Sequence, residues 1–269
     1  MQAPSSFPTH VRQVAGTRVH HIEAGDGDVV LLIHGSLCDY RYWRWQVPAF
    51  SPHFRVVAPS LPGCWPEAMQ AEFSMEKHVQ AVVELSAQLA QDRPLHLVGH
   101  SRGAQVALES ALAMPGRVGR LVLADPGFPF AGEPVQTSIH AQVAARLGAA
   151  PLDDVIGEFV DAVNGPGTWR QTVSWFKDMV RANAWTLRPQ LGDLRRAIDL
   201  GMLARTLDCP VLLVGGELSP PRYGSRIEAL AKALPQARQA VVPRAAHGMN
   251  LANARYFNDI VLRFLRGEA

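Results

Sequence analysis

The sequence has little of what builds disulfide-rich or metal-dependent folds. Its 3 cysteines, Cys38, Cys64 and Cys209, include no pair with the spacing of a disulfide framework or a zinc site. The pattern favours a chain without a metal centre in a reducing compartment, and we therefore expect a cytoplasmic protein. The amino terminus also lacks the basic start and the apolar stretch of a secretory signal peptide.

Strong net charge and long apolar runs are lacking as well. The chain carries 26 basic residues (lysine and arginine) against 24 acidic ones, a formal net charge of +2, and contains no basic cluster. We therefore expect no nucleic-acid partner. No apolar run is long enough to cross a bilayer, so we expect no membrane association. A small-molecule substrate is the partner that remains, and these features leave the oligomeric state open.

The residues that are present suit one sizeable core with alternating strands and helices. The chain of 269 residues is 48% hydrophobic and 19% charged. Two short strands precede the continuous apolar run Val29 to Ile33, which is typical of a strand covered on both faces. The later predicted strands are residues 54–58, 95–98, 120–124, 211–214 and 239–242, and the predicted helices are residues 74–92, 102–114, 222–234 and 251–265. This order predicts an α/β fold with a mostly parallel central sheet flanked by helices.

One long segment interrupts the alternation. Between residues 127 and 205 the sequence shows helical patterns and no convincing strand. We therefore predict an inserted helical lid, or cap, at residues 127–205, and a core domain made of residues 1–126 and 206–269.

The stretch Gly99-His100-Ser101-Arg102-Gly103 matches the pattern G-x-S-x-G. It lies between a predicted strand and a predicted helix, which is the context that a nucleophile elbow requires. The two glycines allow the strand and the helix to approach closely, and the serine is presented at the helix N-terminus, where free N–H groups favour negative charge. The other interpretation of this stretch is a glycine-rich strand-to-helix turn with a serine N-cap.

A second motif follows the apolar strand that ends at residue 33. In His34-Gly35-Ser36-Leu37 we expect the backbone N–H of Ser36 to form an oxyanion hole together with the N–H of Arg102. We interpret His34 as a structural residue that braces this loop, and not as the base.

The general base is expected late in the chain. Of the 10 histidines, His247 alone lies beyond the helical segment, on a loop between the last predicted strand and the last helix. A serine hydroxyl becomes a good nucleophile when a neighbouring imidazole takes its proton, and His247 has the position for this role. The other interpretation is a solvent-exposed loop histidine.

Together these motifs resemble the α/β-hydrolase fold superfamily. The resemblance is carried by HGSL at residues 34–37, by GHSRG at residues 99–103, by the strand alternation with its helical insertion, and by PRAAHGMN at residues 243–250. It covers nearly the whole sequence and is specific to the fold, not to a substrate. It implies a serine hydrolase that needs no cofactor.

The triad acid is where the sequence departs from the family pattern. Many members place it after the strand that follows the lid, in G-E-x-D, whereas this chain has Ser219 at the last position of Gly216-Glu217-Leu218-Ser219. The first possibility is Asp125, at the end of the preceding predicted strand, which is otherwise a turn residue before Pro126. The second is Glu217, and the third is that the reaction uses no acid.

An aromatic loop and the inserted segment supply the expected substrate pocket. The loop CDYRYWRW, residues 38–45, holds four aromatic side chains within six residues, and further tryptophans lie in the helical insertion. Such side chains can wall an apolar pocket or simply pack the loop against the lid. The residues that we expect in the pocket are Leu37, Tyr42, Trp43 and Trp175.

Three functions are compatible with these residues. The leading hypothesis is hydrolysis of a carboxylic ester, or a related acyl bond, of a small and largely apolar substrate by Ser101, His247 and Asp125. The second keeps the fold with other chemistry, as a C–C bond hydrolase, lyase, cofactor-independent oxygenase or biosynthetic cyclase in which His247 is the general base. The third is a ligand-binding protein with a vestigial site, against which the intact serine, histidine and His-Gly loop argue.

Overall fold

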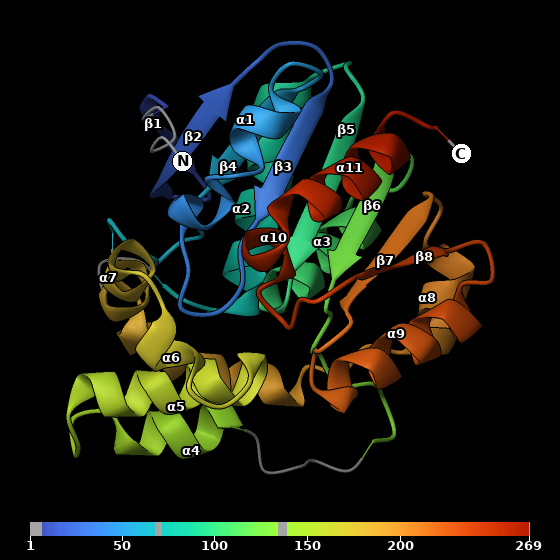
Figure 1. Ribbon diagram of the computed structural model, residues 1–269. Coiled ribbons are helices and arrows are strands. Elements are labelled where there is room, and N and C mark those ends of the chain that lie inside the picture. Colours follow the sequence, from blue (N-terminus) through green and yellow to red (C-terminus); the bar gives the residue numbers. More distant parts are fainter. Residues whose placement is uncertain (1–6, 68–71, 134–138, 269) are drawn as a thin grey trace.

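One sheet organises the structure. The computed structural model describes residues 7–67, 72–133 and 139–268 of the chain. Their eight strands are β1 (Thr9–Val14), β2 (Thr17–Ala24), β3 (Val29–Ile33), β4 (Arg55–Pro59), β5 (Leu95–His100), β6 (Val118–Ala124), β7 (Val211–Gly216) and β8 (Arg238–Val242). The order across the sheet is β1-β2-β4-β3-β5-β6-β7-β8 (Figure 1). Only the β1–β2 and β2–β4 pairings are antiparallel, so the predicted mostly parallel sheet is confirmed.

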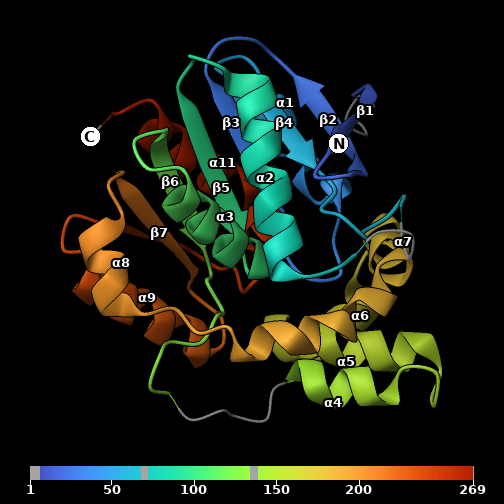
Figure 2. The ribbon, with the colours of Figure 1, turned by 180° about the vertical axis from the view of Figure 1, so that it is seen from behind.

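Helices cover both faces of this sheet, as Figures 1 and 2 show from opposite sides. One face packs against α2 (Met75–Ala90), α3 (Arg102–Ala113), α8 (Leu200–Thr206) and α9 (Pro221–Ala233). The other face packs against α1 (Val47–Phe50) and α11 (Ala254–Leu265). The structure thus has the three layers expected from alternating strands and helices.

The continuous apolar run in β3 follows from this layering. Val29, Leu31 and Ile33 belong to the core on the α2 and α3 side, whereas Val30 and Leu32 belong to the core on the α11 side. All five side chains are fully buried. Because neighbouring residues of a strand point to opposite faces, a strand covered on both sides has no polar position.

The segment inserted between β6 and β7 has an apolar core of its own. Its helices are α4 (Ile139–Arg146), α5 (Leu152–Asn164), α6 (Thr168–Gln171), α7 (Ser174–Ala182) and the 3-10 helices η2 (Ala184–Leu187) and η3 (Pro189–Arg195). Val143, Ile156 and Val180 are among the residues that form this third core, and Leu37 of the sheet domain joins them. By contrast, Leu203 of α8 packs into the sheet core next to α9, so α8 does not share this inner packing.

Most predicted elements lie within a few residues of the observed ones, and two differences stand out. The predicted helix at residues 251–265 is two helices, α10 (Met249–Ala252) and α11, because the backbone of Asn253 leaves the helical conformation. The loop at residues 38–45, for which no helix is predicted, contains the 3-10 helix η1 (Tyr40–Trp43). In the described part of the chain, every helix is too short or too polar to traverse a bilayer.

Candidate active site

The G-x-S-x-G stretch forms a strained turn between β5 and α3. Ser101 has φ 56° and ψ −121°, in the region that disfavours side chains with a Cβ. A Cβ on Gly99 would lie 2.3 Å from the carbonyl oxygen of Gly103, and a Cβ on Gly103 would lie 2.3 Å from that of Ile33. Both glycines are therefore required by the close approach of helix and strand, and this turn holds Ser101 at the N-terminus of α3.

The cavity that Ser101 enters is shared with His247. Both line a cavity of about 830 Å³ at the carboxyl ends of the strands, between the sheet domain and the inserted helices. Among the described residues the Ser101 hydroxyl makes no hydrogen bond, and catalytic hydrogen bonds commonly tighten only when substrate is bound.

The histidine is held by an aspartate at the end of β6. Nδ1 of His247 lies 3.0 Å from Oδ2 of Asp125, and both side chains are buried. The ring of Tyr223 stacks on the imidazole, with 4.2 Å between ring centroids and 17° between planes. With Nδ1 directed at the carboxylate, the second ring nitrogen is available to receive a proton from a nucleophile.

Ser219 completes the support of this carboxylate. Its Oγ donates a hydrogen bond of 2.5 Å to Oδ2 of Asp125, the same oxygen that faces His247, and the Gly216 N–H lies 3.4 Å from Oδ1. The position after β7 that carries the acid in the family pattern therefore contributes a hydroxyl that binds the acid from β6. The backbone of Asp125 is also strained, with φ 41°.

Burial dominates the electrostatics of this pair. It raises the pKa of Asp125 to about 6, against the opposing effect of the Ser219 hydrogen bond. It also lowers the pKa of His247 to about 3, with a smaller contribution from the charge of Arg222. The imidazole is consequently neutral at neutral pH, which is the state that a general base requires.

Glu217, the other acid considered from the sequence, lies elsewhere. Its side chain is exposed, and Oε2 accepts a hydrogen bond of 2.7 Å from the backbone N–H of Arg244. Arg244 has φ 55°, so the carboxylate holds a strained residue in the loop that leads to His247. Of the two acids, Asp125 is the one that contacts the histidine.

The loop after β3 brings Ser36 to the same cavity. His34 braces it, because Nε2 accepts a hydrogen bond of 3.0 Å from the N–H of Leu61 while Nδ1 lies 2.9 Å from the carbonyl oxygen of Gly35. This confirms the structural interpretation of His34, whose pKa is lowered by burial to about 4. Ser36 lines the cavity beside Ser101. Arg102 follows Ser101 as the first residue of α3, where backbone N–H groups lack partners within the helix.

Three of the four expected pocket residues line the cavity. Leu37, Tyr42 and Trp175 do so, but Trp43 does not. The prediction for Trp43 is wrong because the tight η1 turn directs its fully buried ring into the core between the sheet and α11. Trp45, two residues later, lines the cavity in its place.

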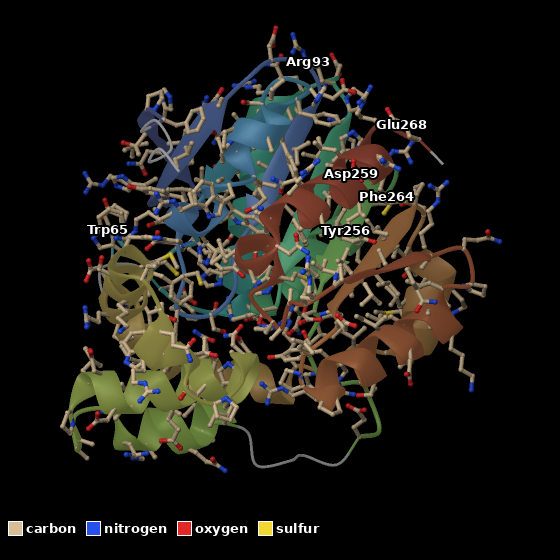
Figure 3. The ribbon with its side chains drawn as sticks, in the orientation of Figure 1. Trp65, Arg93, Tyr256, Asp259, Phe264 and Glu268 are labelled. Atoms are coloured by element: carbon tan, nitrogen blue, oxygen red, sulfur yellow. The ribbon has the colours of Figure 1, made fainter. Side chains whose placement is uncertain are left out.

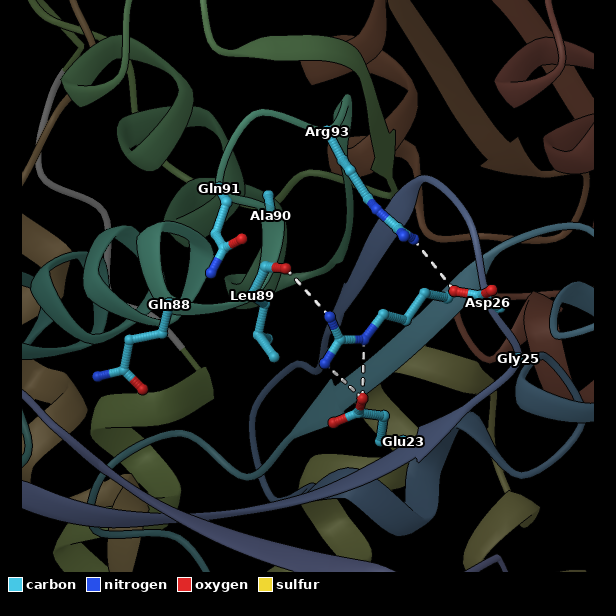
Figure 4. A pocket seen from close by; sticks show the side chains of 9 residues that line it. Glu23, Gly25, Asp26, Gln88, Leu89, Ala90, Gln91 and Arg93 are labelled. Atoms are coloured by element: carbon cyan, nitrogen blue, oxygen red, sulfur yellow. Dashed lines mark hydrogen bonds and ion pairs between the residues drawn. The ribbon is translucent and has the colours of Figure 1, made fainter.

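A second hollow lies far from this chemistry. It has a volume of about 480 Å³ and includes Glu23, Asp26, Arg55 and Arg93 (Figure 4). Arg55 donates to Glu23 at 2.7 Å and Arg93 to Asp26 at 3.0 Å, so these charges are paired with one another. Because Arg55 and Arg93 stand at the amino ends of β4 and β5, this groove is at the opposite end of the sheet from Ser101.

Several residues around the site carry no sequence signal that would have revealed them. Tyr223, which stacks on His247, belongs to no motif, and Gln190 and Asp193 contact the site from the inserted segment. Ser219 is conspicuous in the sequence as a missing acid, but its bond to Asp125 becomes visible only in the fold. Within residues 7–67, 72–133 and 139–268, no cluster of histidine, cysteine and acidic residues is suited to hold a metal ion.

Comparison with known proteins shows which family the chain matches. The model of the alpha/beta hydrolase family matches residues 30–260. A pimeloyl-[acyl-carrier protein] methyl ester esterase of Methylococcus capsulatus is 31% identical over 222 residues, which are 82% of this chain and 77% of that protein. A 2-hydroxymuconate semialdehyde hydrolase of a Pseudomonas species is 27% identical, over 89% of this chain and 71% of that protein. Among solved structures, a thermophilic esterase of Thermogutta terrifontis superposes with a TM-score of 0.79 at 23% identity, covering 97% of this chain and 98% of that one.

Proposed function

The chain belongs to the α/β-hydrolase family and is a hydrolase, and from this premise we propose that it cleaves a carboxylic ester, or a related acyl bond, of a small and largely apolar substrate. Ser101 is the nucleophile, His247 the general base and Asp125 the triad acid. The observation that carries this proposal is the pair of buried side chains, with Nδ1 of His247 3.0 Å from Asp125, in the cavity that Ser101 also lines.

The reaction proceeds in two halves. His247 removes the proton of the Ser101 hydroxyl as its oxygen attacks the ester carbonyl, and the same imidazolium then protonates the departing alcohol. Water repeats the sequence on the acyl-enzyme and releases the acid. Asp125 stabilises the imidazolium in both halves, and its charge is itself stabilised by the hydroxyl of Ser219.

The negative charge on the carbonyl oxygen forms beside two backbone donors. The N–H groups of Ser36 and Arg102 serve as the oxyanion hole, and each such donor contributes ~3 kcal/mol of transition-state stabilisation in a related site. The position of Ser36 on the cavity wall and of Arg102 at the N-terminus of α3 supports this assignment.

The cavity wall indicates the kind of substrate. It is mostly apolar and includes Leu37, Val160, Trp175, Phe176 and Leu251. Among the described residues that line the cavity, Arg244 is the only arginine, lysine or carboxylate residue. The other polar side chains of the lining are neutral. We propose an apolar acyl or alcohol group, with room for an anionic group near Arg244 at the wall.

Labelling with a fluorophosphonate tests the nucleophile and the acid together. Intact-mass analysis should show one adduct on the wild-type chain and none on Ser101→Ala. Asp125→Asn should label far more slowly, whereas Glu217→Gln should label at nearly the wild-type rate because Glu217 contacts the Arg244 backbone instead of the histidine. A folded wild-type chain that takes no adduct would overturn the proposal.

A second candidate function has a specific observation in its favour. One similar protein is a 2-hydroxymuconate semialdehyde hydrolase, whose name denotes hydrolysis of a different kind of substrate. C–C bond hydrolysis, or lyase, oxygenase or cyclase chemistry, would use His247 as the base in the same cavity. A chain that takes the fluorophosphonate but hydrolyses no ester in a broad panel would favour this second function.

We further propose a small-molecule substrate, no cofactor and a cytoplasmic location. The three cysteines are unpaired thiols in the structure, and burial raises the pKa of Cys64 to about 12, so that this thiol is not a competing nucleophile.

A further inference from the structure

Each of the two proposed oxyanion-hole residues has its side chain bonded to the same short piece of chain, in addition to a contact of Arg102 Nη1 with Nδ1 of His78 in α2 at 2.7 Å and of Ser36 Oγ with Nε2 of His140 in α4 at 3.4 Å. Ser36 follows β3 and Arg102 begins α3, yet Oγ of Ser36 donates a hydrogen bond of 2.6 Å to Oε1 of Gln190, and Nε of Arg102 donates one of 2.6 Å to Oδ2 of Asp193. Both acceptors belong to η3 of the inserted segment. We call residues 183–193, which include η2 and most of η3, the clamp segment.

The Arg102–Asp193 bond and the Gln190 end of the other bond are largely shielded from water, whereas Ser36 is half-buried at the cavity wall. Gln190 is 3% exposed, and the side chains of Arg102 and Asp193 are 9% and 14% exposed. A hydrogen bond or ion pair in such surroundings is not readily replaced by water, so its loss leaves a buried polar group without a partner. A displacement of η3 should therefore displace Ser36 and Arg102 as well.

The clamp segment is itself held in register. Nε2 of Gln190 donates to Oγ1 of Thr186 at 3.1 Å, and that hydroxyl donates to the carbonyl oxygen of Asn183 at 2.7 Å. The bond from Nε2 to Thr186 thus fixes the orientation of the Gln190 amide, and this orientation directs its oxygen at Ser36.

A third bond joins the clamp segment to Asp39, three residues after Ser36 in the loop that follows β3. Nδ2 of Asn183 donates to Oδ2 of Asp39 at 2.8 Å, and both side chains are fully buried. Oδ1 of Asn183 accepts a hydrogen bond of 2.8 Å from the backbone N–H of Trp65. Figure 3 shows Trp65 beside α7. The loop that carries the Ser36 N–H is consequently tied to the clamp segment at two places.

We propose that the clamp segment positions the oxyanion hole, with Gln190 fixing the loop of Ser36 and Asp193 fixing the first turn of α3 through Arg102. Gln190 and Asp193 are positioning residues that act through the two backbone donors and need not touch the substrate. The proposal deepens the proposed function and rests on it, because acyl transfer through Ser101 is what places an oxyanion between these donors.

Kinetics separate positioning from simple structural support. Loss of a whole oxyanion donor lowers kcat by about 10²–10³, and a displaced donor should lower it by about tenfold in Gln190→Leu and in Asp193→Ala. KM for a short-chain p-nitrophenyl ester should stay within about twofold. Affinity for an alkyl trifluoromethyl ketone, whose adduct with Ser101 places an oxyanion between the donors, should fall in parallel with kcat/KM.

Two further variants provide the controls. Asp153→Asn removes the charge of Asp153 from its exposed ion pair with Arg181. That pair joins α5 to α7 and does not involve Ser36 or Arg102, so kcat should not change. Ser36→Ala keeps the backbone N–H but removes the hydroxyl, and its effect should be less than additive with that of Gln190→Leu because both variants remove the Ser36–Gln190 bond.

Hydrogen–deuterium exchange provides a readout that does not depend on the reaction. Peptides that contain residues 34–39 and 101–104 should exchange faster in Gln190→Leu and Asp193→Ala than in Asp153→Asn of equal thermal stability. If ketone affinity and exchange in both variants match those of Asp153→Asn, the proposal is overturned. A wild-type chain that cleaves no ester refutes the proposed function instead, and the exchange result still decides whether the clamp segment holds the two donors.

Discussion

The two sides of the candidate active site are built in different ways. On one side, His247, Asp125 and Ser219 come from the loops that follow β8, β6 and β7, so the proposed base and acid, which we call the relay side, both belong to the sheet domain. On the other side, Ser36 and Arg102 are tied to Gln190 and Asp193 across sequence separations of 154 and 91 residues, and these partners belong to the inserted segment.

Because of this difference, substitutions on the two sides should produce different kinetic defects. Substitutions on the relay side should change how a proton is moved and should therefore alter the pH dependence of the rate. Substitutions on the oxyanion side should weaken binding of the transition state at every pH. The two sides are nevertheless connected. The N–H of Gly248 donates to Oδ1 of Asn164 at 2.7 Å and links the histidine loop to α5, and Nε2 of His100, next to Ser101, lies 2.7 Å from the carbonyl oxygen of His247.

The largest effect is expected where the relay is broken outright. Asp125→Asn should lower kcat by about 10⁴, because an amide does not stabilise the imidazolium and favours the wrong tautomer of His247. Steady-state kinetics on an activated ester measure this loss, with Glu217→Gln as the matched carboxylate-to-amide control. Equal losses in the two variants would contradict the assignment of Asp125.

Moving the acid should recover part of that loss. Asp125→Asn combined with Ser219→Asp places the carboxylate after β7, where the family pattern has it, and Oγ of Ser219 already lies 2.5 Å from Oδ2 of Asp125. We expect the double variant to exceed Asp125→Asn by about 10-fold to 100-fold in kcat, a partial recovery of the triad effect. Combining Asp125→Asn with Ser219→Asn, which adds no charge, should recover nothing.

A smaller substitution shifts the pH profile without destroying the triad. Ser219→Ala removes a hydrogen bond that lowers the pKa of Asp125, so this pKa should rise further above its usual range. Activity requires the ionised carboxylate, and hence the acid limb of kcat/KM should move to higher pH. Gln190→Leu should lower the rate with no such movement. A Ser219→Ala profile that superposes on the wild type after scaling would contradict the role of the hydroxyl.

The smallest effect concerns the cavity wall. Arg244→Gln should reduce kcat/KM for a monoester of a dicarboxylic acid by about fivefold or less, because the side chain is exposed and solvent screens an ion pair between it and the substrate. The neutral dimethyl ester of the same diacid should be hydrolysed at an unchanged rate. Increasing salt should reduce the preference of the wild type for the half-ester, and an equal response of both esters to the substitution would exclude charge recognition.

Structural features that depend on neighbouring residues in the chain can be predicted from the sequence. Buried strands such as Val29–Ile33 reveal themselves by unbroken apolar residues, and Ser101 by the glycines that its turn requires. The prediction for Trp43 fails for a local reason, since residues 40–45 contain a tight helical turn whose direction decides which aromatic ring enters the cavity.

Contacts between distant segments were beyond the sequence. The choice between Asp125 and Glu217 depends on which carboxylate the chain packs beside His247, and no periodicity reports that. The link from Ser36 to Gln190 is of the same kind, because serine and glutamine are ordinary surface residues until the fold buries them against each other.

The separate apolar core of the inserted helices has a consequence for how such a chain can diversify over evolutionary time. Mutations at Val160 or Val163 can reshape the substrate cavity without repacking the sheet, so recognition and catalytic chemistry are free to change at different rates. The exception is the piece of the insertion from residue 183 to residue 193. A chimaera that receives another protein's helices would inherit a new specificity, but it would need to retain that piece, or supply equivalents of Gln190 and Asp193, to keep its turnover.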